Sequence, residues 1–119
     1  MLVVDDEPSV RAMVLATIRT RGESFEVIEA GRAEEALARA RESRPELVLL
    51  DVALPDRDGF WVCRELKADS TTANMLVIML TAMGLPSDRD RALEAGADGY
   101  IVKPFSPRAL LAELEQRLG

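Results

Sequence analysis

The sequence predicts an α/β fold, a doubly wound parallel sheet of five strands with helices on both faces. Three observations predict it. Five short apolar runs alternate with five segments of helical periodicity along the 119 residues. Two of the runs, residues 47–50 and 75–80, are continuously apolar, which is typical of strands buried on both faces. No segment has the composition of a linker or a repeat, so we expect one domain spanning residues 1–119.

The expected strands are short and rich in aliphatic residues. In chain order they are residues 2–4, 25–30, 47–50, 75–80 and 100–102. Ligands of doubly wound folds bind at the carboxyl ends of the strands, near the point where the strand order reverses. The residues that follow the first, third, fourth and fifth strands are Asp5 and Asp6, Asp51, Thr81 and Lys103.

The first two helices have clear start and stop signals. The first is expected over residues 8–21, with Pro8 in its first turn and Gly22 as its stop. The second is expected from residue 33, carries small residues that allow close packing, and ends before Pro45. The face of the first helix that should be buried consists of Val10, Met13, Val14, Thr17 and Ile18.

The remaining helices follow turn residues. The third is expected over residues 60–68 after an acidic turn, and a short fourth over residues 89–95 ends at Gly96. Ser106 can cap the fifth helix, with Pro107 at its first position. The residues expected to be buried from the third and fifth helices are Phe60, Cys63, Leu66, Leu110, Leu111, Leu114 and Leu118.

Composition excludes several classes of function. With 15 Lys+Arg against 21 Asp+Glu, the net charge of −6 argues against direct nucleic-acid binding by this domain and against an anionic membrane surface. The chain has no histidine and one cysteine, which excludes histidine metal sites, Ser-His-Asp triads and an internal disulfide. It shows neither a signal peptide nor a run long enough to span a membrane, so we expect a soluble cytoplasmic protein.

Three carboxylates, Asp5, Asp6 and Asp51, are expected at one edge of the sheet. Like charges this close raise one another's pKa or require a cation. Lys103 supplies one positive charge, and Mg²⁺, which prefers carboxylates, waters and phosphate oxygens, would supply two. An Asp carboxylate can itself attack phosphorus, and phosphoryl transfer depends mainly on positioning and charge neutralisation. The cluster therefore favours a metal ion together with a phosphoryl group.

The motifs at these strand ends together resemble the response-regulator receiver domain of two-component signalling, with its CheY-like, flavodoxin-like (βα)5 fold. They are LVVDDEP, LVLLDVALPDRDGF, MLTA and GADGYIVKPF, in order along essentially the whole chain. The resemblance implies that Asp51 accepts a phosphoryl group from a histidine kinase or a phosphotransfer protein. The implied Mg²⁺ ligands are Asp6, Asp51, the backbone carbonyl of Ala53 and, through water, Asp5.

The resemblance also implies a switch. Lys103 would pair with the phosphoryl oxygens, Thr81 would donate its hydroxyl to them, and Tyr100 would follow Thr81 inward. A cis Lys103–Pro104 bond would fix the direction of the lysine. The face formed by the fourth helix, the fifth strand and the fifth helix would then change and be read by a downstream effector domain or protein.

Two alternatives remain open. One is a Mg²⁺-dependent phosphohydrolase with an aspartyl nucleophile, although the second acid that such enzymes commonly carry two residues later is replaced by Ala53. The other is an interaction module that keeps the fold without phosphorylation, although the acids, Thr81 and Lys103 are all present. Trp61 is left open between local packing and a partner surface.

The chain departs from the family pattern at two groups of positions. Ala53 and Met83 are apolar where side chains tune the phosphoryl lifetime, so we predict slow self-dephosphorylation. Receivers of winged-helix DNA-binding regulators typically pair through acids at the positions of Ala109 and Gly99 and an arginine at that of Glu113. Because these three are missing, we expect a monomer or a weak dimer rather than that dimer.

Overall fold

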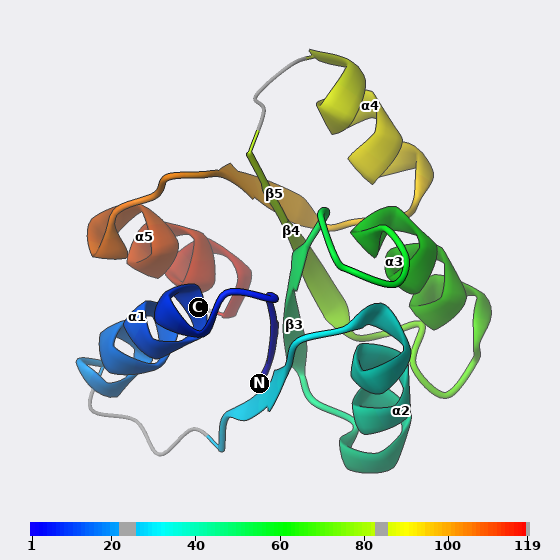
Figure 1. Cartoon of the computed structure of the whole chain (residues 1–119), viewed down its shortest axis with the longest axis horizontal. Helices are drawn as coiled ribbons and strands as arrows, with labels where there is room; N and C mark the ends of the chain where they lie inside the picture. The colour runs from blue at the N-terminus through cyan, green and yellow to red at the C-terminus, as the bar shows by residue number, and fades with distance from the viewer. Residues whose placement is uncertain (22–25, 83–85, 119) are drawn as a thin grey trace.

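The predicted doubly wound sheet is present. The computed structural model describes residues 1–21, 26–82 and 86–118. Its five strands are all parallel and lie in the order β2-β1-β3-β4-β5, so the order reverses between β1 and β3 (Figure 1). They are β1 (Leu2–Val4), β2 (Ile28–Ala30), β3 (Leu47–Asp51), β4 (Leu76–Thr81) and β5 (Gly99–Val102).

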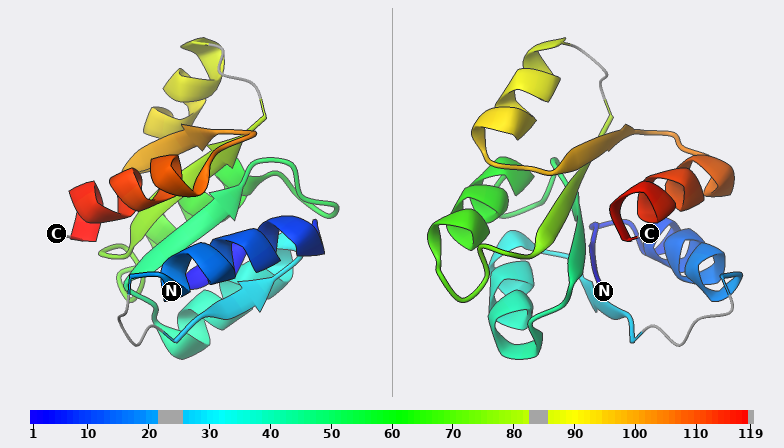
Figure 2. Two further views of the ribbon diagram at one scale, coloured as in Figure 1. Left: turned by 90° about the vertical axis from the view of Figure 1, so that its left-hand side faces the viewer. Right: turned by 180° about the vertical axis from the view of Figure 1, so that it is seen from behind.

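Helices cover both faces of the sheet, as the alternation predicts. They are α1 (Pro8–Arg19), α2 (Ala33–Ser43), α3 (Gly59–Ala68), α4 (Pro86–Glu94) and α5 (Pro107–Leu118). Helices α1 and α5 pack on one face, whereas α2, α3 and α4 lie on the other (Figure 2). In the described part of the chain, no helix is long and apolar enough to cross a bilayer.

The continuously apolar strands are explained by two cores, one on each face of the sheet. Along β3, Val48 and Leu50 face the core under α2 and α3, whereas Leu47 and Leu49 face the core under α1 and α5. All four are at most 1% exposed. Successive side chains of a strand point to opposite faces, so a strand covered on both sides must be apolar at every position.

Several element boundaries differ from the sequence predictions. Strand β2 begins at Ile28 rather than at residue 25, and both Phe25 and Gly22 lie outside the described residues. Strands β3 and β4 each run one residue further than predicted and include Asp51 and Thr81. The reason is that hydrogen bonding continues past these residues, as from the N–H of Val52 to the carbonyl of Leu80 at 3.0 Å.

The helices differ in similar ways. Helix α4 covers Pro86–Glu94 rather than residues 89–95, and α1 ends at Arg19. The buried stripe of α3 is confirmed and also includes Val62. In α5, Leu110 and Leu114 are buried as predicted, but Leu111 and Leu118 are only partly covered because they lie at the edge of the packed face.

Candidate functional site

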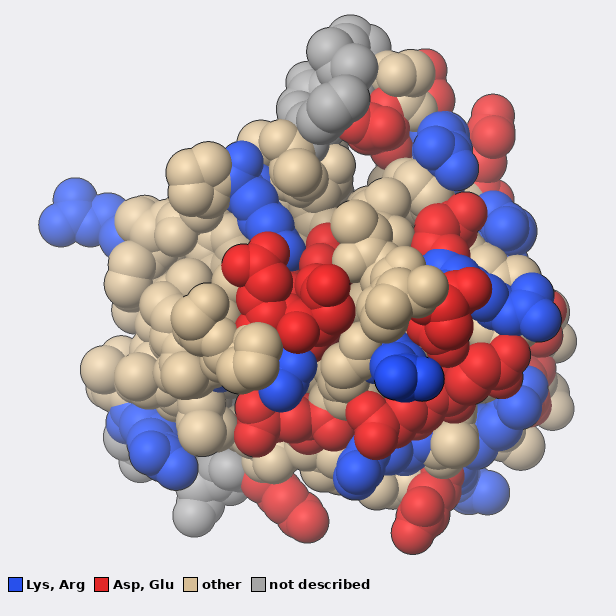
Figure 3. Space-filling model, in the orientation of Figure 1, with Lys and Arg blue, Asp and Glu red and all other residues tan. Residues whose placement is uncertain are grey.

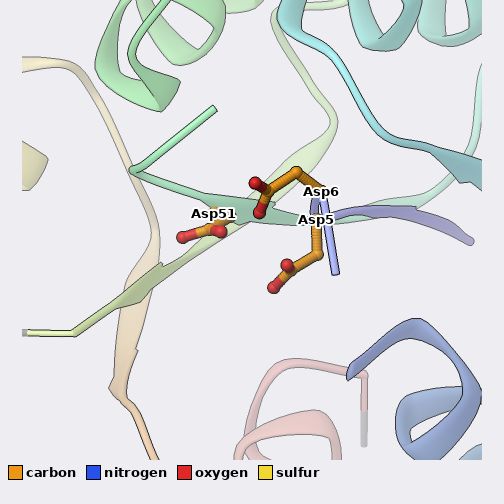
Figure 4. Close-up of side chains that lie close together, drawn as sticks. All are labelled: Asp5, Asp6 and Asp51. Atoms are coloured by element: carbon orange, nitrogen blue, oxygen red, sulfur yellow. The ribbon is translucent and has the colours of Figure 1, made fainter. Parts of the chain in front are cut away.

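Three carboxylates meet where the strand order reverses. Asp5 and Asp6 follow β1, Asp51 is the last residue of β3, and these two strands are neighbours in the sheet. One carboxylate oxygen from each residue can be chosen so that all three lie within 4.8 Å of one another (Figure 4). Asp5 and Asp51 are buried, whereas Asp6 is exposed. Figure 3 shows acidic side chains gathered at this part of the surface.

Lys103 lies against two of these acids. Its Nζ donates to Oδ2 of Asp5 at 2.6 Å and to Oδ2 of Asp51 at 3.1 Å. The lysine follows β5 directly, and the implied cis Lys103–Pro104 bond is confirmed. Burial lowers the pKa of Lys103. The hydrogen bond to Asp5 and the charge of Asp51 raise this pKa by more than burial lowers it, so the net pKa shift is upward. The lysine is therefore positively charged.

The carboxylate of Asp51 is held at both oxygens and is still disfavoured as an anion. Oδ1 accepts the N–H of Ala53 at 3.2 Å, and Oδ2 accepts from Lys103. Burial, and then the charge of Asp5, raise the pKa of Asp51 more than Lys103 and the Ala53 N–H lower it. A further positive charge at this edge would stabilise the anion.

Asp5 is oriented by contacts of its own. Its Oδ1 accepts the N–H of Glu7 at 2.9 Å, and its own N–H donates to the carbonyl of Ala30 at 3.0 Å. The backbone carbonyl of Asp5 accepts a hydrogen bond from Nη1 of Arg11, whose Nε donates to Glu29 at 3.1 Å. No sequence motif marks Arg11, because its contacts depend on where α1 packs against β1 and β2.

Gly59 allows α3 to begin close to Asp51. An ideal Cβ at this position would lie 2.0 Å from the backbone carbonyl oxygen of Asp51, which no real side chain tolerates. The N–H of Gly59 also donates to the carbonyl of Val52 at 2.7 Å. The start of α3 therefore needs a glycine, because the backbone at the end of β3 lies against it.

The residues implied as a switch lie on one face of the sheet. Thr81 is buried at the end of β4, and Tyr100 is half-buried in β5. Met79 of β4 pairs with Tyr100 and Thr81 pairs with Val102, so the side chains of Thr81 and Tyr100 point to the same face, the one covered by α3 and α4. The guanidinium carbon of Arg89 lies 5.9 Å from the centroid of the Tyr100 ring.

Two hollows flank the acidic cluster. One, of about 470 Å³, is lined by Glu7, Val10, Met13, Ala82, Lys103, Pro104 and Phe105. The other, of about 280 Å³, is lined by Val52, Ala53, Thr81, Ala82 and Asp88. Exposed Ala53 and buried Thr81 thus border the same space, whereas Met83 lies outside the described residues.

The cluster fits a magnesium ion. Its donors are all oxygens, which Mg²⁺ prefers, and two oxygens bound to one Mg²⁺ are at most about 4.2 Å apart. The separations within the cluster, up to 4.8 Å, are close to this span. One carboxylate bound through water, as the family resemblance implies for Asp5, would accommodate the difference.

The fold and this acidic edge together define a receiver. The chain belongs to the response regulator receiver domain family, because the sequence model of that family matches residues 1–115. It is 47% identical over 118 residues to the "DNA-binding response regulator MtrA" of Mycolicibacterium smegmatis, which covers 99% of this chain and 50% of that protein. It is also 47% identical to the "Probable transcriptional regulator ycf27" of Porphyra purpurea, over 99% of this chain and 46% of that protein. The chain thus spans about half the length of these relatives.

Solved structures show the same fold. Chemotaxis response regulator CheY4 of Vibrio cholerae matches with a TM-score of 0.89 and 35% identity, covering 97% of this chain and 94% of that one. The receiver domain of sensor histidine kinase PA1611 from Pseudomonas aeruginosa matches with a TM-score of 0.85 and 31% identity, covering 97% and 93%. That second structure has a magnesium ion coordinated in its active site cleft.

Proposed function

We propose that this receiver is a phosphoacceptor switch in a phosphorelay, with Asp51 as the residue that is phosphorylated and Mg²⁺ as its cofactor. The observation that carries the proposal is the Asp51 carboxylate, which is 4% exposed, lies in a cluster with Asp5 and Asp6, and is 3.1 Å from Lys103. A nucleophile that is disfavoured as an anion until a cation arrives suits a reaction that brings a phosphoryl group together with a metal ion.

The donor is a phosphohistidine of a histidine kinase or phosphotransfer protein, since this chain has no histidine. A carboxylate oxygen of Asp51 forms the new bond to phosphorus as the bond from phosphorus to the donor nitrogen breaks; the electron pair of that bond stays on the donor ring, which carries or takes up one proton from solvent and so leaves as neutral histidine. Asp6, Asp51 and the Ala53 carbonyl would hold Mg²⁺ directly, with Asp5 acting through water. The ion supplies positive charge that neutralises the phosphoryl oxygens. Lys103, already beside Asp51, pairs with one of these oxygens.

Phosphorylation then changes the charge at the strand ends. An added phosphoryl group carries about −1.5 to −2 charge, by analogy with other phosphorylated residues. The hydroxyl of Thr81 turns toward it, and Tyr100 fills the space on the same face of the sheet. The surface of α4, β5 and α5 changes as a shift between two populations and is read by an effector domain or protein. The curated relatives, which are longer, are named as DNA-binding or transcriptional regulators.

Labelling tests the assignment of Asp51. Purified protein is incubated with labelled acetyl phosphate and Mg²⁺, and acid-stable and hydroxylamine-labile label are compared. We expect the wild type to take up one hydroxylamine-labile phosphate and Asp51→Asn to take up none while staying folded. Asp90→Asn, which makes the same chemical change at an exposed acid of α4, is the control. Label incorporated by Asp51→Asn would contradict the assignment.

The same preparations separate the two alternatives. Multiple turnover of small phosphate esters would identify a phosphohydrolase. An absence of Mg²⁺-dependent binding of beryllofluoride, a phosphoryl mimic, would favour an interaction module that does not use phosphorylation. We expect beryllofluoride to bind and ester turnover to be absent.

We also propose that the chain is a monomer or forms only a weak dimer. In this structure, Oε2 of Glu113 lies 3.6 Å from Nε of Arg117, one turn later in α5. The guanidinium of Arg117 covers Gly99, where an ideal Cβ would lie 3.0 Å from Nη2. These positions are therefore engaged within the chain, and Ala109 offers no charge. Sedimentation with and without beryllofluoride tests this, and a tight dimer at micromolar concentration would contradict it.

A further inference from the structure

Asp56, in the loop between β3 and α3, caps a helix that begins 23 residues earlier in the chain. Its Oδ1 accepts the N–H of Ala33 at 2.8 Å, and its Oδ2 accepts the N–H of Glu34 at 3.0 Å. These are the first two residues of α2, and the residue at its own N-cap position, Arg32, makes no side-chain cap. Free N–H groups at a helix start need such acceptors.

The carboxylate of Asp56 is suited to this contact. Its slight burial raises its pKa, but the backbone N–H groups of Glu34 and Ala33 lower the pKa more, and the net shift is downward. The side chain therefore stays ionised at neutral pH, with both oxygens as acceptors. The neighbouring ion pair between Arg57 and Glu34 is 51% and 61% exposed, so solvent and salt screen it. Of these two polar contacts between the loop and α2, the cap by Asp56 is therefore the stronger.

The loop that Asp56 anchors also carries part of the acidic site. Ala53, three residues before it, donates its N–H to Oδ1 of Asp51. On the other side, α2 follows β2 directly, and the carbonyl of Ala30 at the end of β2 accepts the N–H of Asp5. Two hydrogen bonds, joined by short stretches of backbone, therefore connect Asp5 through the start of α2 to the segment that carries Ala53.

We propose that Asp56 is a positioning residue for the divalent cation, because its cap on α2 sets where the Ala53 backbone lies relative to Asp5 and Asp6. Asp56 acts through the loop and touches neither the ion nor the phosphoryl group. The inference rests on the proposed function, since it takes Mg²⁺ to bind between these acids and the Ala53 carbonyl. Groups that orient metal ligands commonly change metal affinity by 10- to 100-fold, and a more remote anchor should have a smaller effect.

Mg²⁺ titration of the unphosphorylated protein tests this. The amide signals of Ala53 and Asp5 are followed by ¹H–¹⁵N NMR at 0.15 M salt and at a temperature where every variant is folded. We expect about 3- to 10-fold weaker Mg²⁺ binding in Asp56→Ala. In Asp56→Asn, one amide oxygen still accepts, so the loss should be smaller. In Asp56→Ala without Mg²⁺, the amide of Ala53 should exchange with solvent at least about fivefold faster, because the loop opens more readily.

Glu34→Gln is the matched control. It removes one negative charge close to Asp56, because the Glu34 side chain accepts a hydrogen bond from Arg57, the next residue in the loop. It leaves the backbone N–H groups that Asp56 caps unchanged. We expect its Mg²⁺ affinity to stay within twofold of the wild type. Equal weakening in Glu34→Gln and Asp56→Ala would attribute the effect to charge alone and overturn the inference, as would unchanged affinity in Asp56→Ala. If the wild type itself showed no Mg²⁺-dependent shift at Ala53 or Asp5, the proposed function would fail, and this inference with it.

Discussion

Neutralising Asp51 should stabilise the metal-free protein. At an effective dielectric constant of about 20, two charges 4.8 Å apart repel by about 3.5 kcal/mol, and the attraction at 3.1 Å is about 5 kcal/mol. Burial of the Asp51 carboxylate and its repulsion by Asp5 together outweigh its attraction to Lys103, which is why the pKa of Asp51 is raised. Allowing for one hydrogen bond lost, we expect Asp51→Asn to raise the free energy of unfolding by about 1–2 kcal/mol.

The pH dependence of stability provides a second signature. The pKa of Asp51 is raised above its ordinary value of 3.8, so between these two pKa values the folded protein binds more protons than the unfolded chain. The contribution of Asp51 to stability therefore falls as the pH rises through this window. This fall should be present in the metal-free wild type and absent from Asp51→Asn.

Urea denaturation followed by circular dichroism, in EDTA and between pH 4 and 8, is the assay. For 119 residues, an unfolding entropy of about 250 cal/mol/K converts the expected gain to about 4–8 °C in Tm. Mg²⁺ at ten times its Kd should stabilise the wild type by about 1.4 kcal/mol. This would remove most of the difference in the free energy of unfolding between the wild type and Asp51→Asn. Asp90→Asn should change stability by less than about 0.5 kcal/mol. An Asp51→Asn protein no more stable than the wild type in EDTA, with the same pH slope, would refute the reasoning.

Three further outcomes are expected. Gly59→Ala should lower the free energy of unfolding by about 3 kcal/mol or more, because its Cβ would meet the Asp51 carbonyl. In the control Gly31→Ala, where the nearest contact of the new Cβ is at 3.5 Å, the loss should be under about 1 kcal/mol. Equal losses in urea denaturation would contradict this. Lys67→Met should lower the free energy of unfolding by about 2 kcal/mol, because it removes hydrogen bonds to Asp98 and to two backbone carbonyls. These contacts are far from the acidic cluster, so the phosphorylation rate should not change. A slower phosphorylation rate would contradict this and show that the Lys67 contacts are coupled to the acidic cluster. The phosphorylated protein should lose labelled phosphate in Mg²⁺ over hours, because the side chains of Ala53 and Met83 cannot hydrogen-bond an attacking water strongly. A half-life of seconds would contradict this.

Sequence periodicity predicted the elements well where the pattern is strong. The continuously apolar run that became β3 was confirmed. The stripe of α1 was confirmed at Val14, Thr17 and Ile18, whereas Val10 and Met13 are only partly buried. Boundaries were less accurate, because a strand ends where its neighbour stops pairing. β4 extends to Thr81 since the N–H of Lys103 still donates to its carbonyl.

Side-chain partners were the harder part of the site. That Asp5, Asp6 and Asp51 would meet followed from the rule that parallel strands end at one edge. That Asp56 would cap α2 could not be read from the chain, because donor and acceptor are more than 20 residues apart and no local spacing marks them. Arg11 was missed for the same reason.

By itself, the sequence determined the order and kind of the elements and the edge of the sheet at which the acids gather. Apolar periodicity reflects which sides of each segment are covered, and the alternation of strands and helices favours a parallel sheet. Only the tertiary structure decided that Lys103 contacts Asp5 and Asp51 together, that burial raises the pKa of Asp51, and that Asp56 caps the start of α2. These features depend on strand order, register and burial, which arise from contacts between segments far apart in the chain.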